Sequence, residues 1–177
     1  MEKVIELLAS LPDEAKDLQI NLKRVLEGES LSTEQTWGTA LTAAYFVRNT
    51  QLIAAIQTDA KAAGISEPIF EDARGAAAIM GMNAIYYRFR HIMKSEVYDK
   101  KPADLRMTRM QQVATTKENF ELFSIGPAAL AGCEMCLKVH EAALKKGGMT
   151  EDHVHDAVRI AAVLHGVAVA LESVESR

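Results

Sequence analysis

The sequence predicts an all-helical protein. The chain has 177 residues, of which only four are prolines, and no run of alternating β-branched residues marks a strand. Signals that start and stop helices recur along the chain instead, as capping boxes, prolines in first turns and glycines at helix ends. Together these observations favour a fold built from helices alone.

Four helices are expected in the first half of the chain. Pro12 and the two acids after it suit the first turn of a helix, where proline is tolerated and negative charge is favoured. Ser32 and Gln35 form a capping box, in which each side chain satisfies a free backbone donor. The expected helices run from Pro12 to Gly28, from Ser32 to about Arg48, from a cap at Thr50 to Gly64, and from Ser66 to Met93.

The second half of the chain is expected to resume after a polar break at residues 98–102. A short piece follows this break and ends near Val113. Thr115 and Glu118 form a second capping box and start another helix, which Pro127 is expected to break or kink. The last two helices are expected from near Cys133 to Gly147, and from a cap at Thr150 to about Val174.

Composition and charge exclude several classes of protein. Hydrophobic residues make up 49% of the chain and charged residues 25%, which excludes wholesale disorder. A length of 177 residues fits one compact domain or two small fused units, and we expect a single all-helical domain over residues 1–177. The net charge of −4 gives no electrostatic footprint for nucleic acid, which is not an expected partner. No apolar stretch reaches the roughly 18 residues of a membrane helix, and the N-terminus lacks the pattern of a secretory signal. The expected location is therefore cytoplasmic, with no membrane partner.

A short segment occurs twice in similar form. Residues 75–82 and 126–133 match at two glycines and two alanines, with an offset of 51 residues. One interpretation is a chance pair of segments rich in small residues. The other is a duplicated helical unit, roughly residues 66–95 and 116–147, in which only the second copy carries reactive side chains.

The two cysteines of the chain, Cys133 and Cys136, are three residues apart. At a helix N-terminus they lie on one face and can form a disulfide with little movement of the backbone. The helix dipole and free backbone donors stabilise a thiolate there, which favours Cys133 as the thiol of lower pKa. The same spacing occurs in zinc sites, whose further ligands would have to come from His140, His153 or His155.

His140 follows Cys136 by four residues, so on a helix its imidazole lies on the same face as that thiol. There it can accept the thiol proton and stabilise the thiolate. A base of this kind usually has a group that orients it, and the candidates are Glu121, Glu134 and Glu141. Glu134 is expected to point away from the cysteine face, whereas Glu121 could reach across from the preceding helix.

At these residues the sequence resembles the alkyl hydroperoxide reductase D family, within the carboxymuconolactone decarboxylase-like superfamily. The resemblance covers nearly the whole chain. It implies the helical AhpD-like fold of that family, built here from a duplicated helical unit. Its most specific part is the constellation of Glu121, Cys133, Cys136 and His140, and its supporting segments are residues 35–39, 77–83, 87–88 and 117–122.

The resemblance implies a role for each of these residues. Cys136 would be the peroxide-reactive thiol and would form a sulfenic acid, which Cys133 would resolve to a Cys133–Cys136 disulfide. His140 would help to deprotonate Cys136, and Glu121 would hold His140 and complete a proton relay. The resemblance thus favours Cys136 as the reactive thiol, whereas the helix-dipole argument favours Cys133. The family often has a histidine where this chain has Met135, so a weaker or differently tuned peroxidase is expected.

The implied function is that of an antioxidant enzyme, a thiol-dependent alkyl hydroperoxide reductase (peroxidase). It would reduce organic hydroperoxides, take electrons from the lipoyl group of a dihydrolipoamide acyltransferase, and regenerate the peroxiredoxin alkyl hydroperoxide reductase C. The resemblance implies no bound cofactor or metal, and the family assembles as homotrimers. Three alternatives remain open: a disulfide reductase or redox adaptor with little peroxidase activity, a non-redox helical binding module, and a decarboxylase relative that uses His140 in acid–base chemistry.

Overall fold

The computed structural model describes residues 1–175, and over this range the fold is all-α, as predicted. Within the described residues, nine α-helices and two short 3-10 helices follow one another with no strand between them. In chain order they are α1 (Glu2–Ala9), η1 (Asp13–Ala15), α2 (Lys16–Leu26), α3 (Thr33–Val47), α4 (Thr50–Ala62), α5 (Glu67–Met93), α6 (Glu96–Lys100), η2 (Thr108–Met110), α7 (Lys117–Leu130), α8 (Glu134–Lys146) and α9 (Glu151–Glu175).

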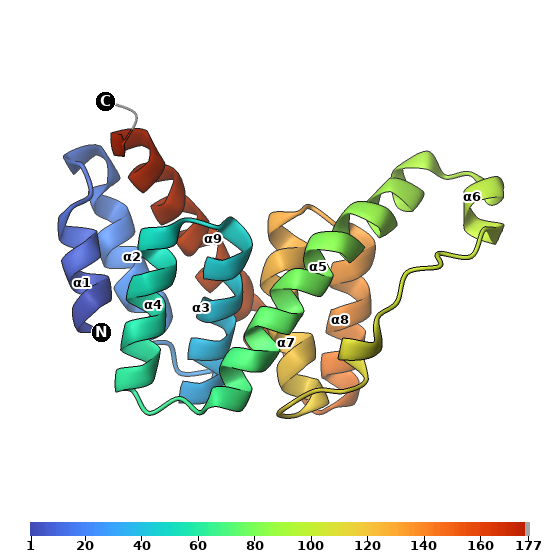
Figure 1. The fold of residues 1–177 in the computed structure, drawn as a ribbon, viewed down its shortest axis with the longest axis horizontal. Coiled ribbons are helices and arrows are strands. Elements are labelled where there is room, and N and C mark those ends of the chain that lie inside the picture. The colour runs from blue at the N-terminus through green and yellow to red at the C-terminus, as the bar shows by residue number, and fades with distance from the viewer. Residues whose placement is uncertain (176–177) are drawn as a thin grey trace.

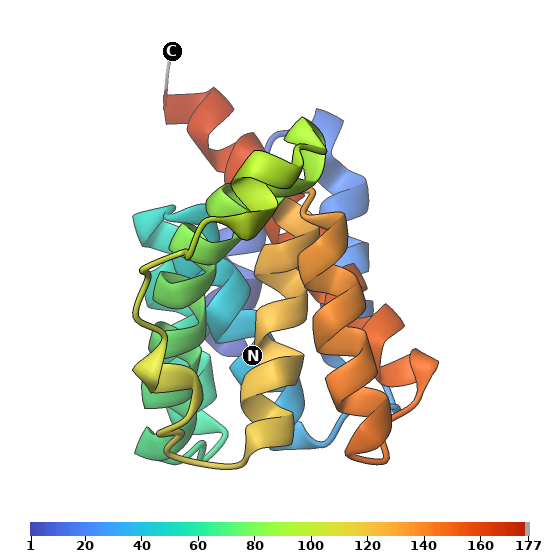
Figure 2. The ribbon, with the colours of Figure 1, turned by 90° about the vertical axis from the view of Figure 1, so that its right-hand side faces the viewer.

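Helix α3 occupies the centre of the packing. It contacts α4, α5, α7 and α9, and its residues 36–44 are buried without interruption. On one side of α3, α1 packs against α4 and α2 packs against α9 (Figure 1). On the other side, α7 and α8 form an antiparallel hairpin (Figure 2). The long helix α5 contacts α3, α7 and α8, and so joins the central helix to this hairpin.

The backbones of α3 and α7 approach each other closely at one glycine. A Cβ atom built on Gly38 would lie 2.1 Å from the Cζ atom of Phe123, whose ring is fully buried. The ring of Phe123 therefore occupies the space that any other residue at this position would need.

Most of the predicted helix boundaries are confirmed. The capping box at the start of α3 has both of its reciprocal bonds, and α5 covers the predicted range. Two caps lie one residue away from the predicted position: Asn49 rather than Thr50 caps α4, and Thr116 rather than Thr115 caps α7. The hydroxyl of Thr115 instead donates a hydrogen bond to the carboxylate of Asp72 on α5, at 2.7 Å.

Three other expectations need correction. Helix α1 was not expected, although it buries Val4 and Leu8 in the core. The polar break expected at residues 98–102 overlaps the short helix α6. Helix α7 continues through Pro127 to Leu130, so the helix does not break there, and a kink at Pro127 stays a prediction. Residues 120–128 are all buried, and this packing offsets the hydrogen bond that proline cannot donate.

Helix α9 is long and apolar enough, by length and composition, to cross a membrane over residues 151–173. In this structure it packs against α2, α3 and α7 instead. Three of its residues that belong to the main hydrophobic core have no exposed surface: Ile160, Leu164 and Val167. A core helix of a globular protein can pass the same test of length and composition.

The two segments proposed as an internal repeat differ in shape. Residues 67–93 form the single continuous helix α5, whereas residues 117–146 form the hairpin of α7 and α8. A common origin for residues 66–95 and 116–147 therefore stays a prediction.

Candidate active site

The turn between α7 and α8 carries the first cysteine. Gly132 has a φ of +62°, a left-handed conformation that glycine adopts without strain. Cys133 follows as the N-cap of α8, and its Sγ accepts a hydrogen bond from the backbone N–H of Cys136 at 3.3 Å. The predicted position of the cysteine pair at a helix N-terminus is confirmed.

Cys133 and Cys136 form a disulfide in this structure, with their Cα atoms 5.3 Å apart. Both residues are buried, but they differ in what they face. Cys136 lines a cavity of about 390 Å³, whereas Cys133 has no exposed surface and does not line it. A ligand in this cavity would therefore meet Cys136 first.

His140 and Glu121 are paired in the cavity that Cys136 lines. The Nδ1 atom of His140 lies 2.5 Å from the Oε2 atom of Glu121, and both side chains are buried. Since an ionised carboxylate can only accept a hydrogen bond, Nδ1 carries the proton, and the Nε2 atom of a neutral imidazole is left as an acceptor. Both residues line the same cavity as Cys136, because the α7–α8 hairpin places Glu121 opposite His140.

The other two candidate acids have different partners. Glu134 is exposed and pairs with Lys138 on the same helix and with His91 on α5. Hydrogen bonding and charge from Lys138, and then from His91, hold the pKa of Glu134 below its ordinary value. Glu141 pairs with Lys145 at 3.2 Å. Of the three acids considered from the sequence, Glu121 is thus the one that contacts His140.

Methionine dominates the apolar part of the cavity lining. Met80 comes from α5, Met107 and Met110 from the segment between α6 and α7, and Met135 from α8. Thioether side chains are flexible and polarizable, so they adapt to apolar groups of different shape. Met135 therefore contributes apolar surface to the cavity directly beside Cys136 in the sequence.

Sequence reasoning missed two contacts that α5 makes with residues on either side of Gly132 and Cys133, where α7 ends and α8 begins. The Nη1 atom of Arg88 donates to the carbonyl oxygen of Ala131 at 2.7 Å, immediately before Gly132. The Nε2 atom of His91 lies 3.2 Å from Oε2 of Glu134, immediately after Cys133. In the sequence these residues stand out only as a basic run, with no indication of what they contact.

Of the three histidines considered as zinc ligands, His140 lines the same cavity as Cys136, whereas His153 and His155 do not line it. Across residues 1–175, no group of three or more His, Cys, Asp or Glu side chains is placed to hold a metal ion. The Nδ1 atom of His153 lies 2.9 Å from Oγ1 of Thr150, at the start of α9, and His155 is exposed. The described side chains therefore offer no zinc site at the cysteine pair.

Comparisons with known proteins agree with this geometry. Residues 98–175 match the carboxymuconolactone decarboxylase family. Alkyl hydroperoxide reductase AhpD of Anaeromyxobacter dehalogenans (strain 2CP-C) is 48% identical over 163 residues, covering 92% of this chain and 87% of that protein. A protein of the same name from Anaeromyxobacter sp. (strain Fw109-5) is 46% identical over 99% of this chain and 94% of its own length. Another, from Coxiella burnetii (strain Dugway 5J108-111), is 42% identical over 89% of this chain and 90% of its own length. By this similarity over nearly its whole length, the chain belongs to the alkyl hydroperoxide reductase AhpD family.

Proposed function

We propose that the protein is a thiol-dependent alkyl hydroperoxide reductase in which Cys136 attacks the peroxide. One observation carries this proposal. Cys136 is the cysteine that lines the cavity, and the same cavity is lined by the buried pair of His140 and Glu121. A thiol beside an oriented imidazole is the arrangement that nucleophilic catalysis requires.

The reaction begins with the reduced dithiol. The Nε2 atom of neutral His140 accepts the proton of Cys136, and Glu121 stabilises the imidazolium through Nδ1. The thiolate attacks the terminal oxygen of the hydroperoxide, so that an S–O bond forms, the O–O bond breaks and the alkoxide leaves. The alkoxide takes the proton from His140 and departs as the alcohol, and Cys136 becomes a sulfenic acid.

Cys133 completes the turnover. Its sulfur attacks the sulfenic sulfur of Cys136, forming the disulfide and releasing water. In the disulfide form the Cα atoms are 5.3 Å apart, which is within the ordinary range for a disulfide. An external dithiol then reduces the disulfide by exchange and becomes oxidised itself.

For that dithiol we propose the lipoyl group of a dihydrolipoamide acyltransferase, acting as a substrate and not as a bound cofactor. We further propose that the reduced protein regenerates alkyl hydroperoxide reductase C, and that it works in the cytoplasm, where thiols are kept reduced. The names of the AhpD relatives support the peroxide chemistry, and the two cysteines of this chain supply one redox pair for it. The lipoyl donor, the peroxiredoxin partner and the cytoplasmic location rest on the family resemblance.

A homotrimer is proposed on the basis of the family resemblance. Its support in the structure is a run of exposed apolar side chains on the C-terminal part of α5 and on α6, where Figure 1 shows the chain extending away from the other helices. The exposed residues are Ile85, Phe89, Ile92, Met93 and Val97. Sedimentation equilibrium should give three times the chain mass, and a monomer would contradict the proposal.

A stoichiometric thiol titration tests the redox proposal. The reduced protein should show two reactive thiols per chain, and one equivalent of cumene hydroperoxide should remove both. Mass spectrometry should then find a peptide in which Cys133 and Cys136 are linked. Retention of both thiols after the peroxide is added would contradict a dithiol peroxidase, and zinc in the same sample would favour the metal alternative.

A further inference from the structure

Part of the cavity lining comes from a segment without regular secondary structure apart from η2. This connecting segment, residues 101–116, runs from the end of α6 back to the start of α7 (Figure 1). Met107, Met110 and Gln111 of the connecting segment line the same cavity as Cys136. The shape of the cavity therefore depends on what holds this segment in place.

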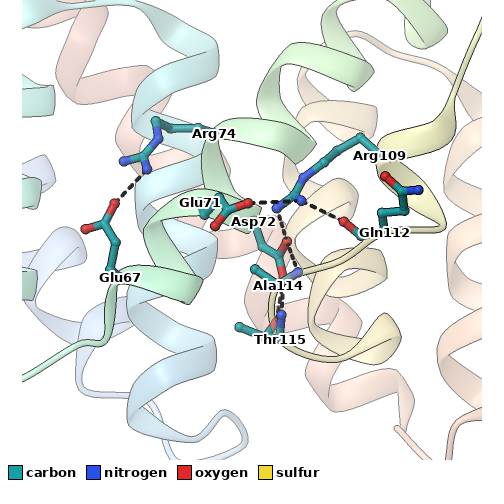
Figure 3. A network of polar contacts seen from close by, with 8 residues as sticks. All are labelled: Glu67, Glu71, Asp72, Arg74, Arg109, Gln112, Ala114 and Thr115. Carbon is teal, nitrogen blue, oxygen red and sulfur yellow. Dashed lines mark hydrogen bonds and ion pairs between the residues drawn. The ribbon is translucent and has the colours of Figure 1, made fainter.

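The buried carboxylate of Asp72, on α5, holds one part of it (Figure 3). Asp72 has no exposed side-chain surface. Its two oxygens accept hydrogen bonds from the backbone N–H groups of Ala114 and Thr115, each at 2.8 Å, and from the Thr115 hydroxyl. A fourth donor is Nη2 of Arg109, at 2.6 Å. A buried carboxylate with four donors has little freedom, so it fixes the groups that donate to it.

Arg109 extends this attachment toward the cavity, since it precedes Met110 directly. Its Nη1 atom lies 3.1 Å from Oε1 of Glu71 and donates to the carbonyl oxygen of Gln112 at 2.6 Å. The guanidinium thus connects α5 to the connecting segment in a fixed geometry that a lysine could not reproduce. Figure 3 shows these contacts converging on one arginine.

Helix α5 leaves room for this arginine at a glycine. A Cβ atom at Gly75 would lie 2.8 Å from the Nε atom of Arg109 and 3.2 Å from its Cγ atom. By contrast, a Cβ atom at Gly81, on the same helix, would meet nothing within 4 Å. The lack of a side chain at Gly75 is therefore part of the site that holds Arg109.

A second attachment acts on the methionines themselves. The Nδ2 atom of Asn83 donates to the Sδ atom of Met107 at 3.1 Å and lies 3.8 Å from the Sδ atom of Met110. Asn83 is 5% exposed and lines the cavity. Both attachments come from α5, so this helix sets the position of the connecting segment relative to Cys136.

We infer that Arg109 is a positioning residue for substrate selection: it holds Met107 and Met110 where they contact the apolar group of a bulky hydroperoxide bound at Cys136. This inference rests on the proposed peroxidase function. Hydrogen peroxide has no apolar group, so it gains nothing from these methionines. Loss of the attachment should therefore reduce selection for the bulky substrate while the chemistry at Cys136 continues.

The test compares kcat/KM for cumene hydroperoxide with kcat/KM for hydrogen peroxide. For Arg109→Gln we expect the ratio of the two to fall by about tenfold, the scale on which apolar pocket contacts discriminate between substrates. The ratio should fall mainly because KM for cumene hydroperoxide rises. Arg109→Lys, which keeps the charge but not the fork of donors, should restore part of the ratio. The control is Arg74→Gln, which removes the arginine of an exposed ion pair with Glu67 on the same helix and should leave the ratio unchanged.

A second pair of variants leaves the Arg109 residue itself unchanged. Gly75→Ala should displace Arg109 and lower the ratio, whereas Gly81→Ala should not. Backbone amides of residues 101–113 should exchange hydrogen faster in Arg109→Gln and Gly75→Ala than in the wild type. If Arg109→Gln does not fold, Gly75→Ala decides the question by the same measurements.

The outcomes separate this inference from the function on which it rests. If the wild type reduces neither peroxide, the proposed peroxidase is wrong. If the wild type reduces both, and the ratio is the same in Arg109→Gln, Gly75→Ala and Gly81→Ala, the peroxidase stands and the role of Arg109 is overturned. A uniform loss of activity toward both peroxides would likewise contradict selection by the connecting segment.

Discussion

The Nδ1 atom of His140 lies 2.5 Å from Oε2 of Glu121, although the two residues are 19 positions apart and belong to different helices. The contact is buried, so little water competes for either group. It fixes which nitrogen of the imidazole carries the proton and leaves the other nitrogen as an acceptor. The α7–α8 hairpin is thus the structural unit that would turn a pair of cysteines into a reactive site.

Glu121→Gln is expected to lower the peroxidase rate by on the order of 10²-fold, because a glutamine cannot stabilise the imidazolium that forms when Cys136 loses its proton. Thiol–disulfide exchange with a small dithiol should fall much less, since the disulfide needs no such base to accept an attack. Stopped-flow measurement of both reactions in one preparation makes the comparison. Equal losses would favour a redox adaptor over a peroxidase.

The two cysteines should differ when each is replaced by serine. Cys136→Ser is expected to abolish turnover with cumene hydroperoxide and a reduced lipoyl donor. Cys133→Ser should still react once and stop with a sulfenic acid on Cys136, because the resolving thiol is gone. A sulfenic-acid-trapping reagent followed by mass spectrometry distinguishes the two. Trapping at Cys133 in the Cys136→Ser variant would reverse the assigned roles and favour the helix-dipole argument.

The sequence was sufficient to predict the helices whose caps are local. The capping box of α3 involves only residues within one turn, so it can be recognised without any tertiary information. Helix α1 was missed because its cap is distant: the carboxylate of Asp59 on α4 accepts from the backbone N–H groups of Lys3 and Val4, at 3.0 and 2.8 Å. The shifted start of α7 has a similar cause, since Asp72 competes for the hydroxyl of Thr115.

The residues of the candidate site also divide into those placed by local spacing and those placed by contacts between distant parts of the chain. Cys133, Cys136 and His140 lie within eight residues, so helical spacing alone placed them on one face. Spacing could not choose among the candidate acids, and only the packing of α7 on α8 brings Glu121 to His140. The contacts of Arg109 depend on a buried carboxylate 37 residues away, for which the sequence gives no local signal.

The pairing of Asp156 predicts a pH-dependent contribution to stability. Partial burial raises the pKa of this carboxyl, but hydrogen bonds from Ser30 and Arg159 outweigh it and leave the pKa below its ordinary value. A pKa depressed by folding contributes stability that is complete above the unfolded value of about 3.9 and is lost as the pH falls through the folded pKa.

Asp156→Asn should therefore lower the free energy of unfolding by about 1 kcal/mol at pH 7, the ordinary net value of such hydrogen bonds. The difference from the wild type should shrink as the pH falls below about 3.9, because the wild type then loses the same charge. Urea unfolding at a series of pH values measures this. A difference that stays constant down to pH 2 would show that the charge of Asp156 is not responsible.

The close approach of α3 and α7 gives a prediction for the fold itself. Gly38→Ala would place a methyl group 2.1 Å from the present position of Phe123 Cζ, and the Phe123 side chain is fully buried. We expect it to lower the free energy of unfolding by about 1–3 kcal/mol, the usual cost of overpacking a core. The control is Gly81→Ala, whose methyl group meets nothing within 4 Å and should be neutral or add up to about 1 kcal/mol through helix propensity. Equal unfolding midpoints in urea for the two variants would mean that Phe123 relaxes without cost, and that the packing of α3 on α7 does not depend on this glycine.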